Sequence, residues 1–299
     1  MLALKPQGFL KCSVTGLAIL LAAMASGAAA TPGQACSPLR VMTYNIRLDL
    51  ASDGADRWSA RRNQFIGQVA FVQPDILGLQ EVLATQKADL EQGLPDYEFV
   101  GVGRDDGKSA GEFSNLAIRK TAFRIASWGN FWLSQTPDRP SKGWDASYIR
   151  LATWAHLVAR DGRQRILAVN THLDNDGAVA RREGARMIRD FIGKNRLSGE
   201  RVVVTGDFNS KPASPPYRLM TGPPLRLMDS RVTAINPPLG PDSTWNGFKL
   251  VPSDPQRIDF VFADPAMTVQ RSSVLAWYFD GPRTASDHFP VVADLTNCR

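Results

Sequence analysis

The chain has 299 residues, of which 43% are hydrophobic and 21% are charged, and its formal net charge is +6. These proportions are those of an ordinary globular protein, so they exclude a disordered or low-complexity chain. The charge permits a phosphate-bearing substrate, but without a block of lysines and arginines it does not support a long nucleic-acid footprint.

The first thirty residues have the pattern of a secretory signal. Lys5 and Lys11 precede an apolar run at residues 16–25, and small residues end at Ala30. We therefore expect residues 1–30 to be a signal peptide and the mature protein to be secreted or periplasmic. The run is shorter than the roughly 20 residues of a membrane span, so we expect no stable membrane insertion, with an uncleaved anchor as the alternative.

The expected export also determines how we interpret the cysteines. Cys12 lies in the signal, whereas Cys36 and Cys298 lie near the two ends of the mature chain. Chain ends in compact domains are often close together, and an exported protein is in an oxidising compartment. We expect a Cys36–Cys298 disulfide in a monomer, and two unpaired thiols are the alternative.

The mature chain contains alternating strand and helix patterns. Apolar segments of strand length lie at residues 39–45, 75–80, 115–119, 154–159, 165–170, 201–205, 257–263 and 290–295. Helical periodicity covers residues 59–72, which end before Pro74, and residues 178–194. Such a mixture indicates a layered α/β fold with mixed or antiparallel sheets, in one domain at residues 36–298. Proline-rich residues 212–224 and 237–255 are expected to be long loops.

Polar side chains gather where these strands begin or end: Asn45, Glu81, His172, Asp174, Asp207, Asn209, Asp259, Asp287 and His288. Each has a structural alternative, such as a turn cap, an Asx turn or a satisfied core histidine. Two of the three histidines nevertheless lie in these clusters. An aspartate within an apolar strand is also costly to bury without a partner. We therefore interpret the clusters as one site.

The residue types favour a site for a hard metal ion. Mg²⁺ prefers oxygen ligands and is usually held by one or two carboxylates plus substrate phosphate oxygens. Zinc is a poorer choice, because no cysteine cluster and no HExxH spacing is present. Asp259 and His288 could form a carboxylate–histidine pair of the kind that acts as a general base. Asp207 and Asn209, two residues apart, would point the same way in an extended backbone while Phe208 faces the core.

The motifs MTYNIR, GLQEV, NTHLDN, TGDFN, RIDFVF and SDHFPV occur in this order. In this order they resemble the endonuclease/exonuclease/phosphatase superfamily, which has the DNase I-like fold. The resemblance covers nearly all of the mature chain. It implies a four-layer α/β sandwich, in which two mixed β-sheets pack face to face with helices on the outside. It also implies hydrolysis of phosphoesters with Mg²⁺ or Mn²⁺, as one or two ions.

The resemblance also implies roles for the individual residues. The expected metal residues are Glu81 as the main ligand, Asn45 beside it, and Asp287, directly or through water. The expected catalytic residues are Asp207 to orient or deprotonate the attacking water, Asn209 to hold a phosphate oxygen, His172 to bind the phosphate or protonate the leaving oxygen, and His288 paired with Asp259. Whether Asp207 or His288 is the general base stays open.

Residues 131–154 are expected to line a substrate cleft. Trp144, Asp145 and Arg150 are the candidates, with Arg150 as a phosphate clamp because its fork suits phosphate oxygens. The alternative is that the tryptophans are core anchors. No covalent nucleophile is indicated, so direct attack by water is expected. The expected substrate is a small or extracellular phosphoester. The alternatives are an extracellular nuclease acting on DNA or RNA and an inactive binding module.

Overall fold

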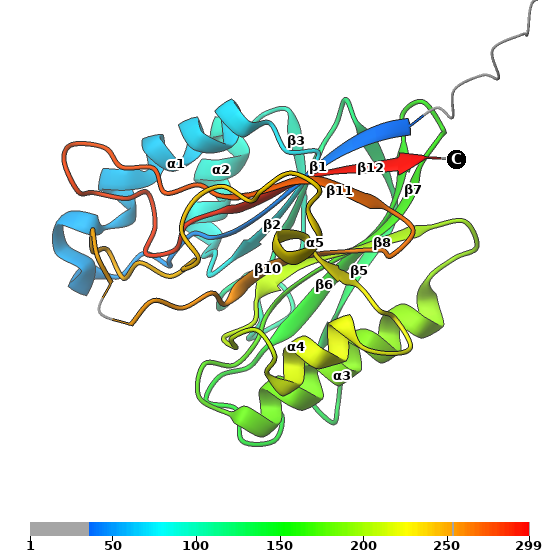
Figure 1. Cartoon of the computed structure of the whole chain (residues 1–299). Coiled ribbons are helices and arrows are strands. Elements are labelled where there is room, and N and C mark those ends of the chain that lie inside the picture. Colours follow the sequence, from blue (N-terminus) through cyan, green and yellow to red (C-terminus); the bar gives the residue numbers. More distant parts are fainter. Residues whose placement is uncertain (1–35, 253, 299) are drawn as a thin grey trace, which may run out of the picture. The chain divides into compact units, whose positions relative to one another are not determined.

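Two β-sheets of six strands each form the centre of the part of the chain that the structure describes (Figure 1). The computed structural model describes residues 36–252 and 254–298, so the predicted signal peptide lies outside the described residues. The first sheet contains, in spatial order, β11 (Thr268–Val274), β12 (Val291–Cys298), β1 (Cys36–Asn45), β2 (Ile76–Gln80), β4 (Leu116–Arg119) and β3 (Tyr97–Val100). The second contains β5 (Phe123–Trp132), β6 (Leu151–Ala159), β7 (Arg165–His172), β8 (Arg201–Asp207), β10 (Asp259–Ala263) and β9 (Met228–Asp229).

The two sheets have the same internal pattern. Each has one parallel pair at its centre, β1 with β2 and β7 with β8, and its other neighbouring strands are antiparallel. The four central strands therefore end at the edge of the sandwich where their antiparallel neighbours β10 and β12 begin. Both sheets are mixed, which confirms the predicted class.

Helices cover the outer face of each sheet (Figure 1). The first sheet is covered by α1 (Trp58–Val72) and α2 (Ala84–Gly93), and the second by α3 (Ala178–Asn195) and α4 (Pro215–Thr221). Two short helices, η1 (Ala51–Asp56) and α5 (Ser230–Thr233), lie in connections. The structure thus has the predicted four layers.

The run Val202-Val203-Val204 explains why these strands are apolar throughout. Val203 packs between the two sheets, whereas Val202 and Val204 pack against α3 and α4 on the outer face. Successive side chains of a strand point to opposite faces, so a strand covered on both faces needs apolar residues at every position. This double burial gives β8 a rigid frame up to Asp207.

The predicted strands correspond to β1, β2, β4, β6, β7, β8, β10 and β12, and the predicted helices to α1 and α3. The four strands that were not predicted are β3, β5, β9 and β11, which are the edge strands of the two sheets. In β5 the middle of the strand is largely exposed, so it lacks a continuous apolar run. The helix α2 was also missed, because only Gln86 and Leu90 of its ten residues are buried.

The chain termini of the described region lie side by side in the first sheet (Figure 1). β1 and β12 are antiparallel, and Cys36 is the register partner of Cys298. Among the helices of the described residues, none combines the length and the apolar character that a membrane crossing requires.

Candidate active site

The site lies at the edge where the central strands end. Asn45 ends β1, Glu81 follows β2, His172 ends β7 and Asp207 ends β8. In the second sheet, Asp207 is the register partner of both His172 and Asp259. Of these residues, Glu81, His172 and Asp207 line a cavity of about 590 Å³.

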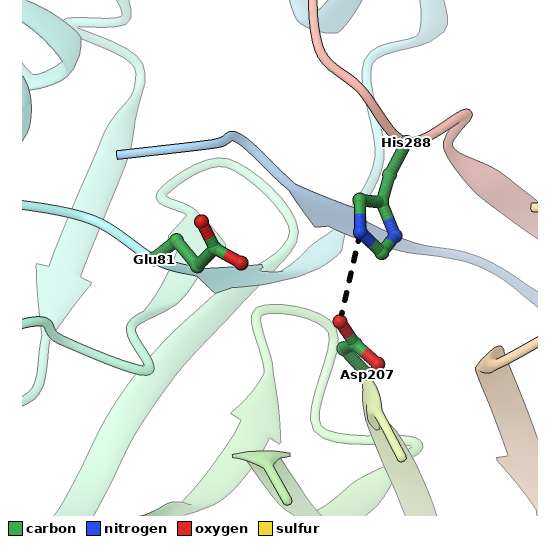
Figure 2. Close-up of side chains that lie close together, drawn as sticks. All are labelled: Glu81, Asp207 and His288. Atoms are coloured by element: carbon green, nitrogen blue, oxygen red, sulfur yellow. Dashed lines mark ion pairs between the residues drawn. The ribbon is translucent and has the colours of Figure 1, made fainter. Parts of the chain in front are cut away.

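Glu81, Asp207 and His288 converge in this cavity (Figure 2). One ligand atom from each residue lies within 4.8 Å of the others, which makes them a possible metal-binding group among the described residues. Nε2 of His288 is 3.8 Å from Oδ2 of Asp207. Glu81 has a φ of 62°, in the left-handed region, and this turn aims its carboxylate inward after β2. Two carboxylates with an imidazole are a suitable donor set for a divalent cation.

Asn45 holds the two carboxylates together. Its Nδ2 donates to Oε1 of Glu81 at 2.8 Å and to Oδ2 of Asp207 at 3.0 Å. Its Oδ1 accepts the backbone N–H of Arg47 at 3.0 Å. The amide nitrogen, and not the expected amide oxygen, therefore faces the carboxylates.

Asp287 lines the same cavity but is not part of the three-residue group. Its Oδ2 is 3.8 Å from Nη1 of Arg47, and its backbone carbonyl accepts from Asn246 and Gly247. Burial and the nearby Glu81 carboxylate raise the pKa of Asp287, although His288 and Arg47 oppose this rise. Of the two expected acidic metal ligands, Glu81 belongs to the group that could hold an ion and Asp287 does not.

His288 and Asp259 form the expected pair. Nδ1 of His288 is 2.8 Å from Oδ2 of Asp259, and both residues are buried. This bond turns Nε2 toward Asp207. Burial opposes charge on the ring, but Asp259, Asp207 and Asp287 outweigh it and raise the pKa of His288 well above its ordinary value. The ring is therefore a cation in the absence of other ions.

The environment of Asp207 strongly perturbs the pKa of its carboxyl group. Burial and the Asp259 carboxylate raise its pKa to about 7, against the opposing effects of His288, Asn209 and Asn45. The contribution of Asp259 comes from the sheet register, because β8 and β10 place Asp207 and Asp259 directly opposite each other. A carboxylate with this pKa can take up and release a proton near neutral pH.

His172 is held as a neutral ring. Its Nε2 accepts from Nδ2 of Asn209 at 3.0 Å and lies 3.5 Å from Oδ2 of Asp207. The proton is assigned to Nδ1, which is 3.9 Å from Oε2 of Glu112. Burial, with Arg150 and other cations nearby, lowers the pKa of His172 well below its ordinary value.

The turn after β8 serves the structure and the site together. The backbone N–H of Asn209 donates to Oδ1 of Asp207 at 2.9 Å, which is an Asx turn. Phe208 is fully buried, as predicted. The predicted extended backbone is wrong at Asn209, whose φ is 44°. Both polar side chains still reach His172, because the left-handed residue turns the Asn209 amide back toward it.

Of the three residues expected in the substrate cleft, the structure places one at the cavity. Arg150 lines the cavity and its Nη2 donates to Oδ1 of Asn175 at 2.9 Å. Asp145 accepts the backbone N–H groups of Val179 and Ala180, so it caps the start of α3. Among the described residues that line the cavity, neither Asp145 nor Trp144 is present. Arg150 alone of the three is in contact with the cavity.

Several cavity residues were not predicted: Arg47, Glu112, Tyr148, Asn175 and Gln256. Glu112 is joined to Arg104 by two hydrogen-bonded contacts, at 2.8 and 2.7 Å. Both lie in the segment between β3 and β4, which is rich in glycine and charged residues and resembles an ordinary surface loop. Neither residue stood at a predicted strand end, so the pattern used for the others could not find them.

The sequence pattern of the Endonuclease/Exonuclease/phosphatase family matches residues 42–288, and the chain belongs to this family. Members are typically hydrolases that act on phosphoester bonds, and they generally use a divalent metal ion.

Solved structures agree with this assignment. A family member from Bacteroides thetaiotaomicron is 35% identical with a TM-score of 0.84, and the match covers 89% of this chain and all of that one. A mannosyl-6-phosphatase from the same species is 36% identical with a TM-score of 0.81, covering 86% and 99%. D. rerio TDP2, complexed with a single-stranded DNA product, shares the fold at 19% identity, with a TM-score of 0.68 and coverage of 87% and 99%.

A curated relative is the protein L388 of Acanthamoeba polyphaga mimivirus. It is 28% identical over 167 residues, which are 52% of this chain. The match spans 60% of the length of that protein.

Proposed function

We propose that this protein is a Mg²⁺- or Mn²⁺-dependent phosphoesterase that cleaves small phosphoesters by direct attack of water. The observation that carries the proposal is the convergence of Glu81, Asp207 and His288 in one cavity, which His172 and Arg150 also line. The family assignment and the similarity to a mannosyl-6-phosphatase support it.

The metal would be held by Glu81 and Asp207, with the His288 ring beside them. These carboxylates lie together in a cavity that is lined by four acids, Glu81, Glu112, Asp207 and Asp287, which is a suitable environment for a divalent cation. When bound, the ion would offset charge on the phosphoryl oxygens and lower the pKa of a bound water. The side chain of Asn45 would keep the two carboxylates in place through its Nδ2 donor.

Side chains of the protein would orient the water and take part in proton transfer. Asp207 would orient a water whose oxygen bonds to phosphorus while the P–O bond to the leaving group breaks. The proton of that water would pass to Asp207, because the His288 ring is already protonated, and the leaving oxygen would receive one from water, because the His172 ring is neutral. Asn209 and the imidazolium of His288, oriented by Asp259, would stabilise charge on the phosphoryl oxygens. The products are an alcohol and a phosphate.

A panel of substrates tests the proposal. The purified mature protein would be assayed with Mg²⁺, with Mn²⁺ and with a chelator, on an aryl phosphomonoester, an aryl phosphodiester, sugar phosphates, sphingomyelin, plasmid DNA and RNA. Hydrolysis of small esters that is lost with chelator is the expected result. Activity that persists after chelation would exclude the metal role. Cleavage of DNA or RNA alone would replace the proposed function by that of an extracellular nuclease.

We also propose that the mature protein is an exported monomer with a Cys36–Cys298 disulfide. The pattern of residues 1–30 and the register pairing of the two cysteines support this. Expression of the whole chain, cell fractionation and mass spectrometry with and without reductant would test it. A protein that retains residues 1–30, or whose mass does not change on reduction, would contradict the respective parts.

A further inference from the structure

Arg150 is buried with unused hydrogen-bond donors. Its side chain is 6% exposed, and Nη2 is bonded to Asn175, while Nε and Nη1 have no hydrogen-bond partner among the described residues. The nearest carboxylate oxygen, Oδ2 of Asp174, is 3.5 Å from Nε. Buried donors without partners are costly, so their retention in a cavity wall indicates an acceptor that is supplied by a ligand.

A second guanidinium, that of Arg104, lies near Arg150. Arg104 is also buried. Its Nη1 and Nη2 contact the two carboxylate oxygens of Glu112, and its Nε has no hydrogen-bond partner among the described atoms. Both guanidiniums lie over Tyr148, at 5.2 Å for Arg104 and 5.6 Å for Arg150. A side cavity of about 10 Å³ is lined by both arginines and by His172. The two cations therefore raise the electrostatic potential on the His172 side of the site.

Another arginine, Arg47, also lines the cavity, and it contacts both carboxylate oxygens of Asp53 at 3.0 Å. The acids Glu81, Asp207 and Asp287 line the same cavity as Arg150. The cavity thus offers a place for a cation next to the carboxylates and a place for an anionic oxygen next to Arg150.

We propose that Arg150, supported by Arg104, binds the third non-bridging oxygen of a terminal phosphate and thereby selects phosphomonoesters over phosphodiesters. A monoester dianion has three such oxygens, and they would face the metal ligands, the His172–Asn209 pair and Arg150. A diester has only two, so its second ester group would place an uncharged, substituted oxygen against the unpaired N–H groups. This inference rests on the proposed function.

The test compares the two ester classes in matched variants. The kcat/KM for an aryl phosphomonoester and for the corresponding aryl phosphodiester would be measured in the wild type, Arg150→Met and Arg150→Lys, with Mn²⁺. We expect the wild type to prefer the monoester, and Arg150→Met to lose about 100-fold on the monoester but only about threefold on the diester. Arg150→Lys keeps the charge without the fork, so we expect a loss of about tenfold on the monoester.

Inorganic phosphate provides a readout without turnover, because it presents the same oxygens as the monoester. Its inhibition constant should rise about tenfold or more in Arg150→Met, with the unchanged thermal unfolding midpoint as the check on folding. Arg62→Met, an exposed arginine of α1 paired with Asp89, should leave both kcat/KM values unchanged. If Arg150→Met does not fold, Asn175→Ala removes the acceptor that orients Nη2, and the ratio of the two kcat/KM values should fall severalfold.

The outcomes separate this inference from the proposed function. Equal losses on both esters in Arg150→Met, or a wild type that prefers the diester, would overturn the selectivity role while metal-dependent hydrolysis stands. A wild type that hydrolyses neither ester with either metal would overturn both.

Discussion

Two cavities near opposite ends of β1 have similar volumes but differ in how their charged side chains are paired. The candidate active site, at the end of β1, has about 590 Å³, and a second cavity near its start, lined by Arg40, Asp75, Arg119 and Asp294, has about 510 Å³. In the second cavity each carboxylate has a guanidinium partner: Nε of Arg40 lies 2.6 Å from Asp294, and Nε of Arg119 lies 3.1 Å from Asp75. Volume therefore does not separate the two cavities.

The distribution of charge does separate them. In the active-site cavity, the acids lie close to one another. Asp207, Asp287 and Glu112 have raised pKa values, because burial and neighbouring carboxylates disfavour their negative charge. In the second cavity, both carboxylates, Asp75 and Asp294, are bonded to a guanidinium, and a third arginine, Arg271, also lines it. Buried carboxylates whose pKa is raised by one another are typical of functional sites, and this is the difference that identifies the site.

The largest expected difference between the cavities is in activity. His288→Ala and Asp207→Ala should each lower kcat by about a thousandfold, because each removes a group that handles a proton or developing charge. The matched change in the second cavity, Arg119→Met, should alter kcat less than twofold. Steady-state kinetics on the best substrate of the panel measures both. Unchanged hydrolysis in either active-site variant would show that the site assignment is wrong, and a large loss in Arg119→Met would remove the contrast.

Arg61 connects two backbone segments next to the active site through buried hydrogen bonds. This fully buried side chain of α1 donates to the backbone carbonyls of Ile46, Arg47, Asp56 and Ala285. It thereby joins the loop after Asn45 to the segment that carries His288. Arg61→Met should leave these carbonyls unsatisfied and lower the free energy of unfolding by about 3 kcal/mol.

The kinetics of Arg61→Met test its positioning role. We expect a fall in kcat of at least about tenfold with little change in KM, because the reacting groups shift while the Arg150 side is retained. Arg61→Lys should recover part of the loss. A variant with lowered stability and wild-type kcat would limit Arg61 to a structural role.

Metal binding should stabilise the protein through the active-site cavity alone. Mn²⁺ at about one hundred times its dissociation constant should add about 2.7 kcal/mol, an increase of about 5 °C in the unfolding midpoint. Glu81→Gln should abolish most of this shift, because it removes a charged ligand. The matched variant Asp75→Asn, in the second cavity, should retain it. Calorimetric scans with and without metal measure the shift, and equal shifts in wild type and Glu81→Gln would argue against this metal site.

The sequence predicted the interior of this fold better than its margins. Strands covered on both faces, such as β8, carry continuous apolar runs, whereas all four edge strands were missed because their exposed faces tolerate polar residues. The same logic applies to the site. Residues such as Glu81 and Asp207 could be predicted because the ends of central strands meet at one edge of the sandwich.

Arg104 and Glu112 could not be predicted in this way. They reach the cavity from a connection whose glycines and charged residues are typical of any exposed loop, and their mutual pairing depends on tertiary packing. The prediction for Asp145 was wrong for a related reason. Asp145 caps α3, a predicted helix that begins 33 residues further along the chain, and the sequence does not show that these two segments meet in the fold. Contacts that depend on how loops pack are beyond periodicity and spacing.

A smaller effect is expected at Asp174, beside the Arg150 side of the cavity. Burial opposes its ionisation, but the backbone N–H groups of Gly177, Ser147 and Tyr148, together with Arg150, outweigh it and lower its pKa. Because the folded pKa lies below the unfolded value near 4, the stabilisation is present above that pH and is lost as the pH falls through the folded pKa. Asp174→Asn should cost about 2 kcal/mol at pH 7, and the cost should shrink on acidification. Urea titrations at pH 7 and pH 3 measure it, and a cost that does not change with pH would contradict the electrostatic explanation.

The smallest effect on stability is expected in the second cavity. The side chains of Arg40 and Asp294 are 42% and 27% exposed, so water screens their attraction despite the 2.6 Å contact. Exposed pairs contribute about 0.2–1 kcal/mol, and Arg40→Met should lower the free energy of unfolding by no more than about 1 kcal/mol. It should not change kcat for either ester class. The urea midpoint at low and high salt measures the pair, because screening by salt should shrink the difference from the wild type. A loss of several kcal/mol would mean that this cavity, like the active site, depends on its charges, and the contrast between the two would then rest on catalysis alone.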